Sequence, residues 1–168
     1  MKSNRGFSLI ELLIVVVIIG IIAAIAIPNL MASRRAANEA STVSAQRTLF
    51  GANASYAATK GNGSYAGSLS TPGTSSLAEL MAAGFIDEVL GSGEKSGYSF
   101  LGDRLEATPT GPQTFYFAAN PSITTGVLST GTRRFGVGID GVIRSDLADL
   151  NIPFDSVTLA AAQPINSP

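Results

Sequence analysis

The hydrophobic residues are concentrated in one unbroken run near the N-terminus. Leu12 to Ile27 contains only apolar residues and one glycine, and no charge lies between Glu11 and Arg34. A helix of this length rises about 1.5 Å per residue and spans roughly 30 Å, the hydrocarbon thickness of a bilayer. The core helix of a soluble domain would repeat a polar face about every 3.6 residues, and this run has none. The pattern therefore predicts a helix that lies in a membrane or inside a larger protein assembly.

The pattern becomes that of an amphipathic helix after Pro28. Gly20 within the run and Pro28 directly after it are the two weakest helix formers of this segment, and proline lacks a backbone N–H. We therefore expect a helix break or kink at these positions. A second helical stretch is predicted from Leu30 to about Thr59. Its expected packing seam consists of apolar and small residues at spacings of three and four, which are Ala36, Ala40, Val43, Phe50, Ala54 and Ala57.

The remaining chain predicts a small antiparallel sheet. A loop over 61–96 contains a short helix, which a capping box from Ser76 to Glu79 is expected to open. Alternating apolar residues over 97–149 indicate strands near Tyr98, Phe115 and Phe135, and Asp140-Gly141 is typical of a hairpin turn. The tail over 150–168 is expected to be extended. The predicted fold class is α+β, with the second half of a long helix, over 30–60, packed on the sheet.

Composition narrows the chemistry of the chain. Only 14% of the 168 residues are charged, the net charge is −1, and there is no Cys or His. These absences exclude disulfides, thiolate or histidine catalysis, and nearly every zinc, copper or haem site. The charge also argues against a nucleic-acid binder that neutralises phosphates. Asp140, Asp146 and Asp149 are poorly spaced for calcium. We therefore expect no enzyme activity, no cofactor and no metal site.

The residues before the apolar run form an unusual junction, Arg5-Gly6-Phe7-Ser8-Leu9-Ile10-Glu11. A secretory signal peptide cut near Ala24-Ile25-Ala26 is one alternative, but its apolar region would be shorter and would lack a carboxylate. A plain single-pass anchor explains the length but not Glu11. Lys2 and Arg5 are expected to hold the N-terminus in the cytoplasm by the positive-inside rule, so that the rest of the chain lies outside that membrane.

This junction closely resembles the class III signal of type IV pilins and type II secretion pseudopilins. The resemblance implies that a prepilin peptidase removes the leader, residues 1–6, after Gly6 and that Phe7 is then N-methylated. It implies that Glu11 sets the register of subunits by pairing with the amino group of a neighbour's Phe7. Gly20 and Pro28 match the helix-breaking positions of the family, and residues 7–29 match its transmembrane and polymerisation helix.

The function implied by the resemblance is that of a structural subunit of a type IV pilus. The chain would be held in the inner membrane with its C-terminal head outside the cytoplasm, and would then join an extracellular helical filament of identical subunits. Its partners would be the prepilin peptidase and an inner-membrane assembly platform. A major pseudopilin of type II secretion and a minor pilin are the alternatives. Gly63-Ser64-Tyr65-Ala66 stands where a typical major pseudopilin has Tyr-Pro, which favours the pilus.

Overall fold

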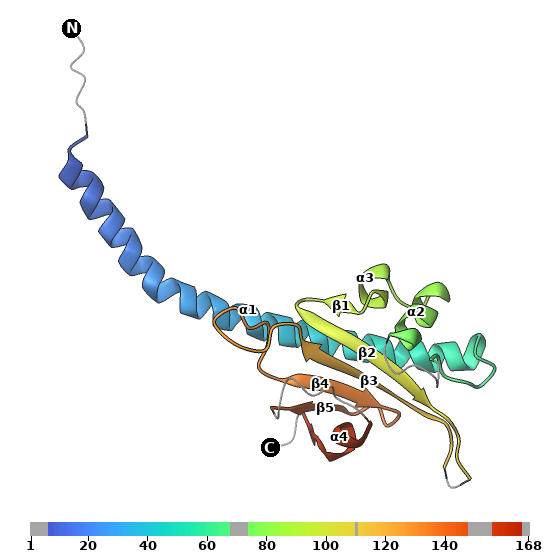
Figure 1. Cartoon of the computed structure of the whole chain (residues 1–168). Coiled ribbons are helices and arrows are strands. Elements are labelled where there is room, and N and C mark those ends of the chain that lie inside the picture. Colours follow the sequence, from blue (N-terminus) through green and yellow to red (C-terminus); the bar gives the residue numbers. More distant parts are fainter. Residues whose placement is uncertain (1–6, 68–73, 110, 148–155, 166–168) are drawn as a thin grey trace.

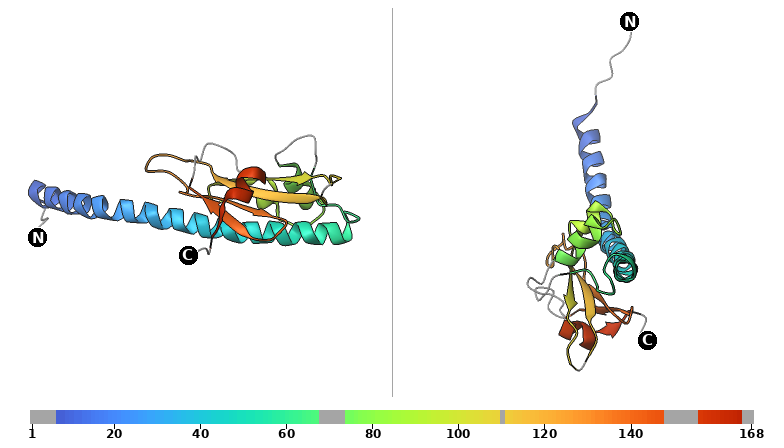
Figure 2. Two further views of the ribbon diagram at one scale, coloured as in Figure 1. Left: turned by 90° about the horizontal axis from the view of Figure 1, so that it is seen from below. Right: turned by 90° about the vertical axis from the view of Figure 1, so that its right-hand side faces the viewer.

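The computed structural model describes residues 7–67, 74–109, 111–147 and 156–165. One helix, α1, runs from Leu9 to Thr59 over 51 residues. Its first half protrudes, and its second half lies along the sheet of the head (Figure 1). Figure 2 shows the same arrangement from two further sides. The α+β prediction is confirmed.

In the single chain, α1 remains helical through the two positions at which we expect a helix break or kink. Gly20 and Pro28 both lie inside α1, which remains helical on either side of them. Pro28 removes one backbone hydrogen bond, and the bonds of the neighbouring turns persist, so a proline can bend a helix without ending it. Accordingly, α1 curves between its protruding half and the head (Figure 1).

The head contains one antiparallel sheet, whose strands pair in chain order. The strands are β1 (Glu94–Lys95), β2 (Tyr98–Leu105), β3 (Thr114–Pro121), β4 (Arg134–Gly138), β5 (Ile143–Asp146) and β6 (Gln163–Pro164). The other helices are α2 (Ser75–Ala82), α3 (Glu88–Gly91) and α4 (Ser156–Ala161). The predicted strands near Tyr98, Phe115 and Phe135 are confirmed.

The predicted hairpin joins β4 to β5. The backbone N–H of Gly141 donates to the carbonyl of Gly138 at 3.0 Å. Gly141 has a φ of +71°, which favours glycine. A Cβ at this position would also lie 3.0 Å from the ring of Phe50. The same glycine therefore permits both the turn and its close approach to α1.

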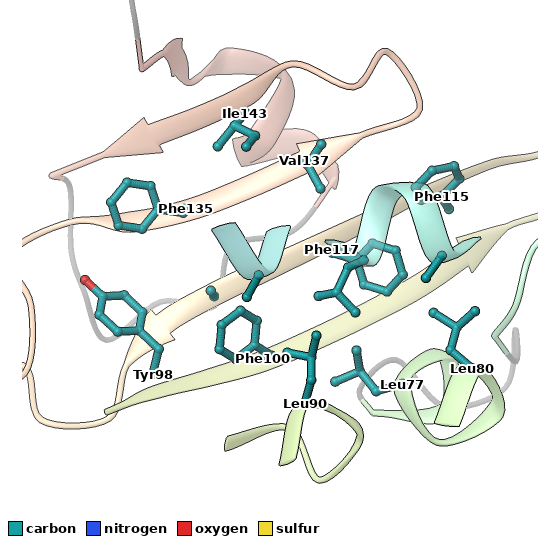
Figure 3. Packing of buried hydrophobic residues seen from close by; sticks show 14 of the residues in the cluster. Leu77, Leu80, Leu90, Tyr98, Phe100, Phe115, Phe117, Phe135, Val137 and Ile143 are labelled. Carbon is teal, nitrogen blue, oxygen red and sulfur yellow. The ribbon is translucent and has the colours of Figure 1, made fainter. Parts of the chain in front are cut away.

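The core lies between the sheet and the second half of α1. Phe100, Phe117 and Phe135 come from three neighbouring strands and are almost completely buried (Figure 3). Leu49 of α1 is fully buried in the same cluster. Leucines of α2 and α3 close the same cluster (Figure 3). Gly102 lies opposite Phe117 in the β2–β3 register, and a Cβ there would come within 2.2 Å of the Phe117 ring. This glycine makes room for the aromatic side chain.

The face of α1 that packs on the sheet differs from the predicted seam. Ala36, Ala40 and Ala54 are exposed, and Val43 and Phe50 are half-buried. The buried residues of α1 are Glu39, Thr42, Ala45, Gln46, Leu49, Ala52 and Asn53. The head supplies hydrogen-bond partners for two of the polar members, Glu39 and Asn53. Asn53, for example, accepts a hydrogen bond from the backbone N–H of Ala66 at 2.9 Å.

Glu39 ties α1 to the end of the loop that precedes β4. Its carboxylate accepts from the N–H and the hydroxyl of Thr132 at 2.9 and 2.7 Å. It also accepts from Nε and Nη2 of Arg133 at 3.0 and 2.8 Å. Burial would raise the pKa of Glu39, but the hydrogen bonds from Thr132 and then Arg133 outweigh burial and hold the pKa below its ordinary value. The ionised carboxylate is therefore part of the fold.

The predicted capping box of α2 is wrong. The helix begins at Ser75 after Thr74, and the residues of the expected box contact other elements. The Ser76 hydroxyl donates to the carbonyl of Ala66 at 3.0 Å. Glu79 accepts from the N–H of Gly67 at 2.8 Å and from the Tyr56 hydroxyl. These side chains hold the loop after α1 against α2 instead of capping a helix.

The prediction of an extended tail is also wrong for the described part of that segment. The tail forms α4 and then β6, which pairs with β5. Leu159 of α4 packs on Tyr116 and Ala118, on a separate cluster from the main core. The sheet therefore extends from Glu94 to Pro164, and the tail contributes a helix that covers apolar residues of β3.

Apolar substitutions of two buried polar side chains of α1 should change the stability of the fold in opposite directions. Gln46 is fully buried, and neither polar atom of its amide has a hydrogen-bond partner among the described residues. We expect Gln46→Met to raise the free energy of unfolding by about 1–3 kcal/mol, because it removes an unpaired polar group. Asn53→Leu should lower it by a similar amount, because it leaves the N–H of Ala66 unpaired. Denaturant unfolding of the full chain in detergent would measure both changes. Destabilisation by Gln46→Met would contradict the argument.

The Glu39 contacts should make stability depend on pH in the acid range. Because the folded-state pKa is lowered, the stabilisation is complete above the ordinary glutamate pKa of about 4.3 and is lost as pH falls through the folded value. Glu39→Gln should lower the free energy of unfolding at neutral pH by about 1.5–3 kcal/mol and flatten its acid dependence. Unfolding at pH 7 and pH 3 tests this. The exposed Glu94→Gln is the control that should match the parent chain.

Candidate functional site

The protruding half of α1 is an apolar surface with no partner in the described part of the chain. Large apolar side chains from Leu9 to Leu30 are 50–82% exposed. An 18-residue window of this helix has a mean hydropathy of 3.2 with no buried residue. By length and composition the helix can cross a membrane. Burial of α1 in the head begins at Glu39, so the apolar half takes no part in the core.

The residues of the junction lie at the beginning of this helix. Ser8 is the N-cap in an extended conformation, and Phe7, which precedes it, is 89% exposed. The backbone N–H of Ser8 donates to Oε2 of Glu11 at 2.9 Å. Gly6 lies outside the described residues. Phe7 and Ser8 are therefore outside the helix, and Glu11 holds the helix end.

The capping contact of Glu11 was not anticipated from the sequence. Ser8-Leu9-Ile10-Glu11 has the spacing of a capping box, so the signal was present. The contact gives the carboxylate a hydrogen-bond donor from its own chain. It also gives the negative charge a favourable position in the first turn, where backbone N–H groups are unpaired.

The positions of the predicted helix break have few contacts. A Cβ at Gly20 would meet nothing within 4 Å. After Pro28, the side-chain amide of Asn29 donates to the carbonyl of Ile25 at 3.2 Å. The isolated chain thus gives no steric reason for glycine at position 20. Loss of helix between Gly20 and Pro28 within an assembly stays a prediction.

The head holds several open cavities. One of them has a volume of about 710 Å³ and lies between β4, β5, α4 and β6. It contains Arg134, whose Nη2 pairs with Asp146 Oδ2 at 2.9 Å. Within the described residues there is no group of three or more acidic, His or Cys side chains that could hold a metal ion. The feature with the most distinctive chemistry is therefore the apolar helix and its N-terminal junction.

Comparison with known families gives a match at this junction. Residues 1–27 match the prokaryotic N-terminal methylation motif. No solved structure matches the chain significantly.

Relatives of known name include components of two filament systems. The chain is 59% identical over 39 residues to the "Type IV wide pilus major component PilA4" of Thermus thermophilus. It is 47% identical over 53 residues to the "Type IV major pilin protein PilA" of Myxococcus xanthus. It is 40% identical over 52 residues to the "Type II secretion system core protein G" of Klebsiella pneumoniae.

These similarities cover a limited part of each protein. The aligned residues are 23%, 32% and 31% of this chain, and 30%, 24% and 37% of the three relatives in the same order. The N-terminal segment, which carries the methylation motif and the protruding apolar helix, is thus similar to the matching part of named pilins and of a type II secretion core protein.

Proposed function

We propose that this chain is the structural subunit of a type IV pilus, anchored in the inner membrane before assembly and polymerised through the protruding half of α1. The observation that carries the proposal is the exposed apolar helix joined to a head with its own core. In the membrane, lipid surrounds the apolar side chains. In a filament, the helices of identical neighbours replace the lipid.

The proposal includes the processing of the N-terminus. A prepilin peptidase cuts between Gly6 and Phe7, with the leader on the cytoplasmic side and the head on the other side of the membrane. Phe7 then becomes the N-terminal residue and is N-methylated. The methylation motif over residues 1–27 and the non-helical conformation of Phe7 and Ser8 support this step. An assembly platform in the inner membrane then adds the processed subunit to the filament.

Glu11 is proposed to set the register between subunits. In the isolated chain its carboxylate is held by the N–H of Ser8, which makes it tolerable at the edge of the membrane. When the apolar helices bundle, water leaves the site, and an unpaired carboxylate opposes assembly. The amino group of a neighbour's Phe7 supplies the missing cation at one axial position only, so the pair selects that position.

A pseudopilin of type II secretion is the second candidate, and the relative from Klebsiella pneumoniae favours it. Pilins and pseudopilins share the N-terminal signal, so the N-terminal helix cannot separate them. A minor pilin shares the same signal and anchor. The long surface filament distinguishes the major pilin from both alternatives.

Electron microscopy of the source cells should show surface filaments that disappear when the gene is deleted. Mass spectrometry of sheared filaments should find a chain that begins at Phe7 with one added methyl group. Gly6→Val should leave uncut precursor in the membrane, because the peptidase needs close access to the backbone there. Ser3→Val in the same leader is the control and should be processed normally.

Two other results would contradict the pilus. Loss of protein secretion without any surface filament would indicate the pseudopilin. A mature chain that begins at Ile27 would indicate an ordinary secretory signal.

Substitutions of Glu11 separate its charge from its capping contact. Glu11→Gln keeps a hydrogen-bond acceptor for Ser8 but has no charge for the amino group of Phe7. We expect both Glu11→Gln and Glu11→Val to be processed and retained in the membrane but to form no filaments, because stranding one partner of a buried ion pair costs about 3–5 kcal/mol. Glu11→Asp should be impaired to a smaller degree. Filament counts and immunoblots of membrane fractions measure these outcomes.

Normal filament numbers from Glu11→Gln subunits alone would show that capping, rather than charge pairing, is the function of this side chain. Normal numbers from Glu11→Val would exclude both functions.

A further inference from the structure

The loop between β3 and β4 presents two large apolar side chains at a tight turn. The N–H of Ser129 donates to the carbonyl of Gly126 at 3.2 Å, which leaves Val127 and Leu128 at the two central positions. Each of these side chains is 70% exposed. Single exposed apolar residues are common, but an exposed apolar pair beside a larger apolar surface is typical of an interaction site.

The loop is held firmly against α1. Arg35 Nη1 donates to the Ser129 hydroxyl at 3.1 Å, and Asn38 Nδ2 donates to the carbonyl of Thr130 at 2.9 Å. The contacts of Glu39 with the loop end, described above, add to these bonds. A loop that is already ordered loses little conformational entropy when it binds a partner. The turn is therefore preorganised for contact.

The turn lies where α1 leaves the head. Leu128 lines a groove of about 310 Å³ together with Met31 and Arg34 of α1. Leu30, at the end of the apolar half, is 61% exposed. The apolar surface of the protruding helix thus continues onto the turn. A molecule that covers the helix near Leu30 also meets the turn.

Arg34 adds a positive charge to this surface. It is exposed and has no hydrogen bond or ion pair among the described residues. We refer to Val127, Leu128 and Arg34 together as the base patch. A partner of the base patch should offer an apolar side chain next to a negative charge.

The chain itself carries such a surface at another place on the head. Val89 of α3 is 55% exposed, and the exposed Glu88 and Glu94 flank it in sequence without an ion pair in the described part of the chain. We refer to these three residues as the α3 patch. In Figure 1 the β3–β4 loop points toward the protruding half of α1, whereas α3 lies farther from that half.

We propose that the base patch of one subunit docks on the α3 patch of a second copy of this chain. The inference rests on the proposed filament, because the neighbours that cover the apolar helix are then identical chains. The two patches are complementary in apolar character and in charge. Because they are different surfaces, the contact is heterologous, and it can repeat along an open helical filament rather than close into a dimer.

Aspartate substitutions test the base patch with a closely matched control. Leu128 and Leu147 are 70% and 71% exposed in the isolated chain. Leu128→Asp should reduce the yield of sheared filaments about tenfold or more, since the loss of one buried leucine contact changes an equilibrium constant to that extent. Leu147→Asp should leave the yield unchanged. Immunoblots should show equal amounts of both variants in the membrane.

Cysteine pairs test the partner surface, because the natural chain has no cysteine. Filaments made of subunits with both Val89→Cys and Leu128→Cys should give a ladder of disulfide-linked multimers on a non-reducing gel. Each single-cysteine variant should stay monomeric on the gel. The pair Val89→Cys with Leu147→Cys controls for random collisions between subunits and should give no ladder.

The outcomes separate this inference from the proposed function. If the natural chain forms no surface filaments, the proposed function fails. If filaments form but the 89/128 pair links no better than the 89/147 pair, the docking proposal is overturned while the pilus stands. Equal filament yields from Leu128→Asp and Leu147→Asp would overturn it independently.

Discussion

The insolubility of the first half of α1 is the constraint on which the rest of the structure depends. Each large apolar side chain that moves out of water contributes about 1.5–3 kcal/mol, and a long series of them is exposed between Leu9 and Leu30. The head cannot bury this series, since its core is already closed by the sheet, the second half of α1 and the small helices. The apolar half must therefore be covered by lipid or by other protein chains. A helix of membrane length with a single carboxylate near its beginning can be covered in either way, by lipid or by other chains.

The continuity of α1 links that apolar half to the head. Glu39, Gln46 and Asn53 lie at intervals of seven residues on the buried face of α1. Glu39 bonds to the loop that precedes β4, and Asn53 bonds to the loop that follows α1. These bonds fix the rotation of α1 about its own axis. Because the helix is unbroken through Pro28, the same rotation is passed to the apolar half. A head that is oriented in an assembly would therefore orient the side chains of the helix as well.

The head reaches this rigidity without disulfides. The chain contains no cysteine, and polar contacts between distant segments take the place of a covalent link. The β3–β4 loop is bonded to α1 at several positions, and the tail returns through α4 to add β6 to the sheet edge. These connections leave the outer surfaces of the loop and of α3 free for other molecules.

The sequence by itself determined the features that depend on local order. The length of the apolar run, its carboxylate, the Gly6-Phe7 junction, the alternating strands and the Asp140-Gly141 turn follow from the identity of adjacent residues. Tertiary structure decided which face of α1 is buried, what Ser76 and Glu79 contact, and where the tail lies. Glu39 illustrates the reason, because its partner Thr132 is 93 residues away. Glu39 and Asn53 are buried where the fold brings a hydrogen-bond partner to them, and the residues next to them in sequence do not supply that partner.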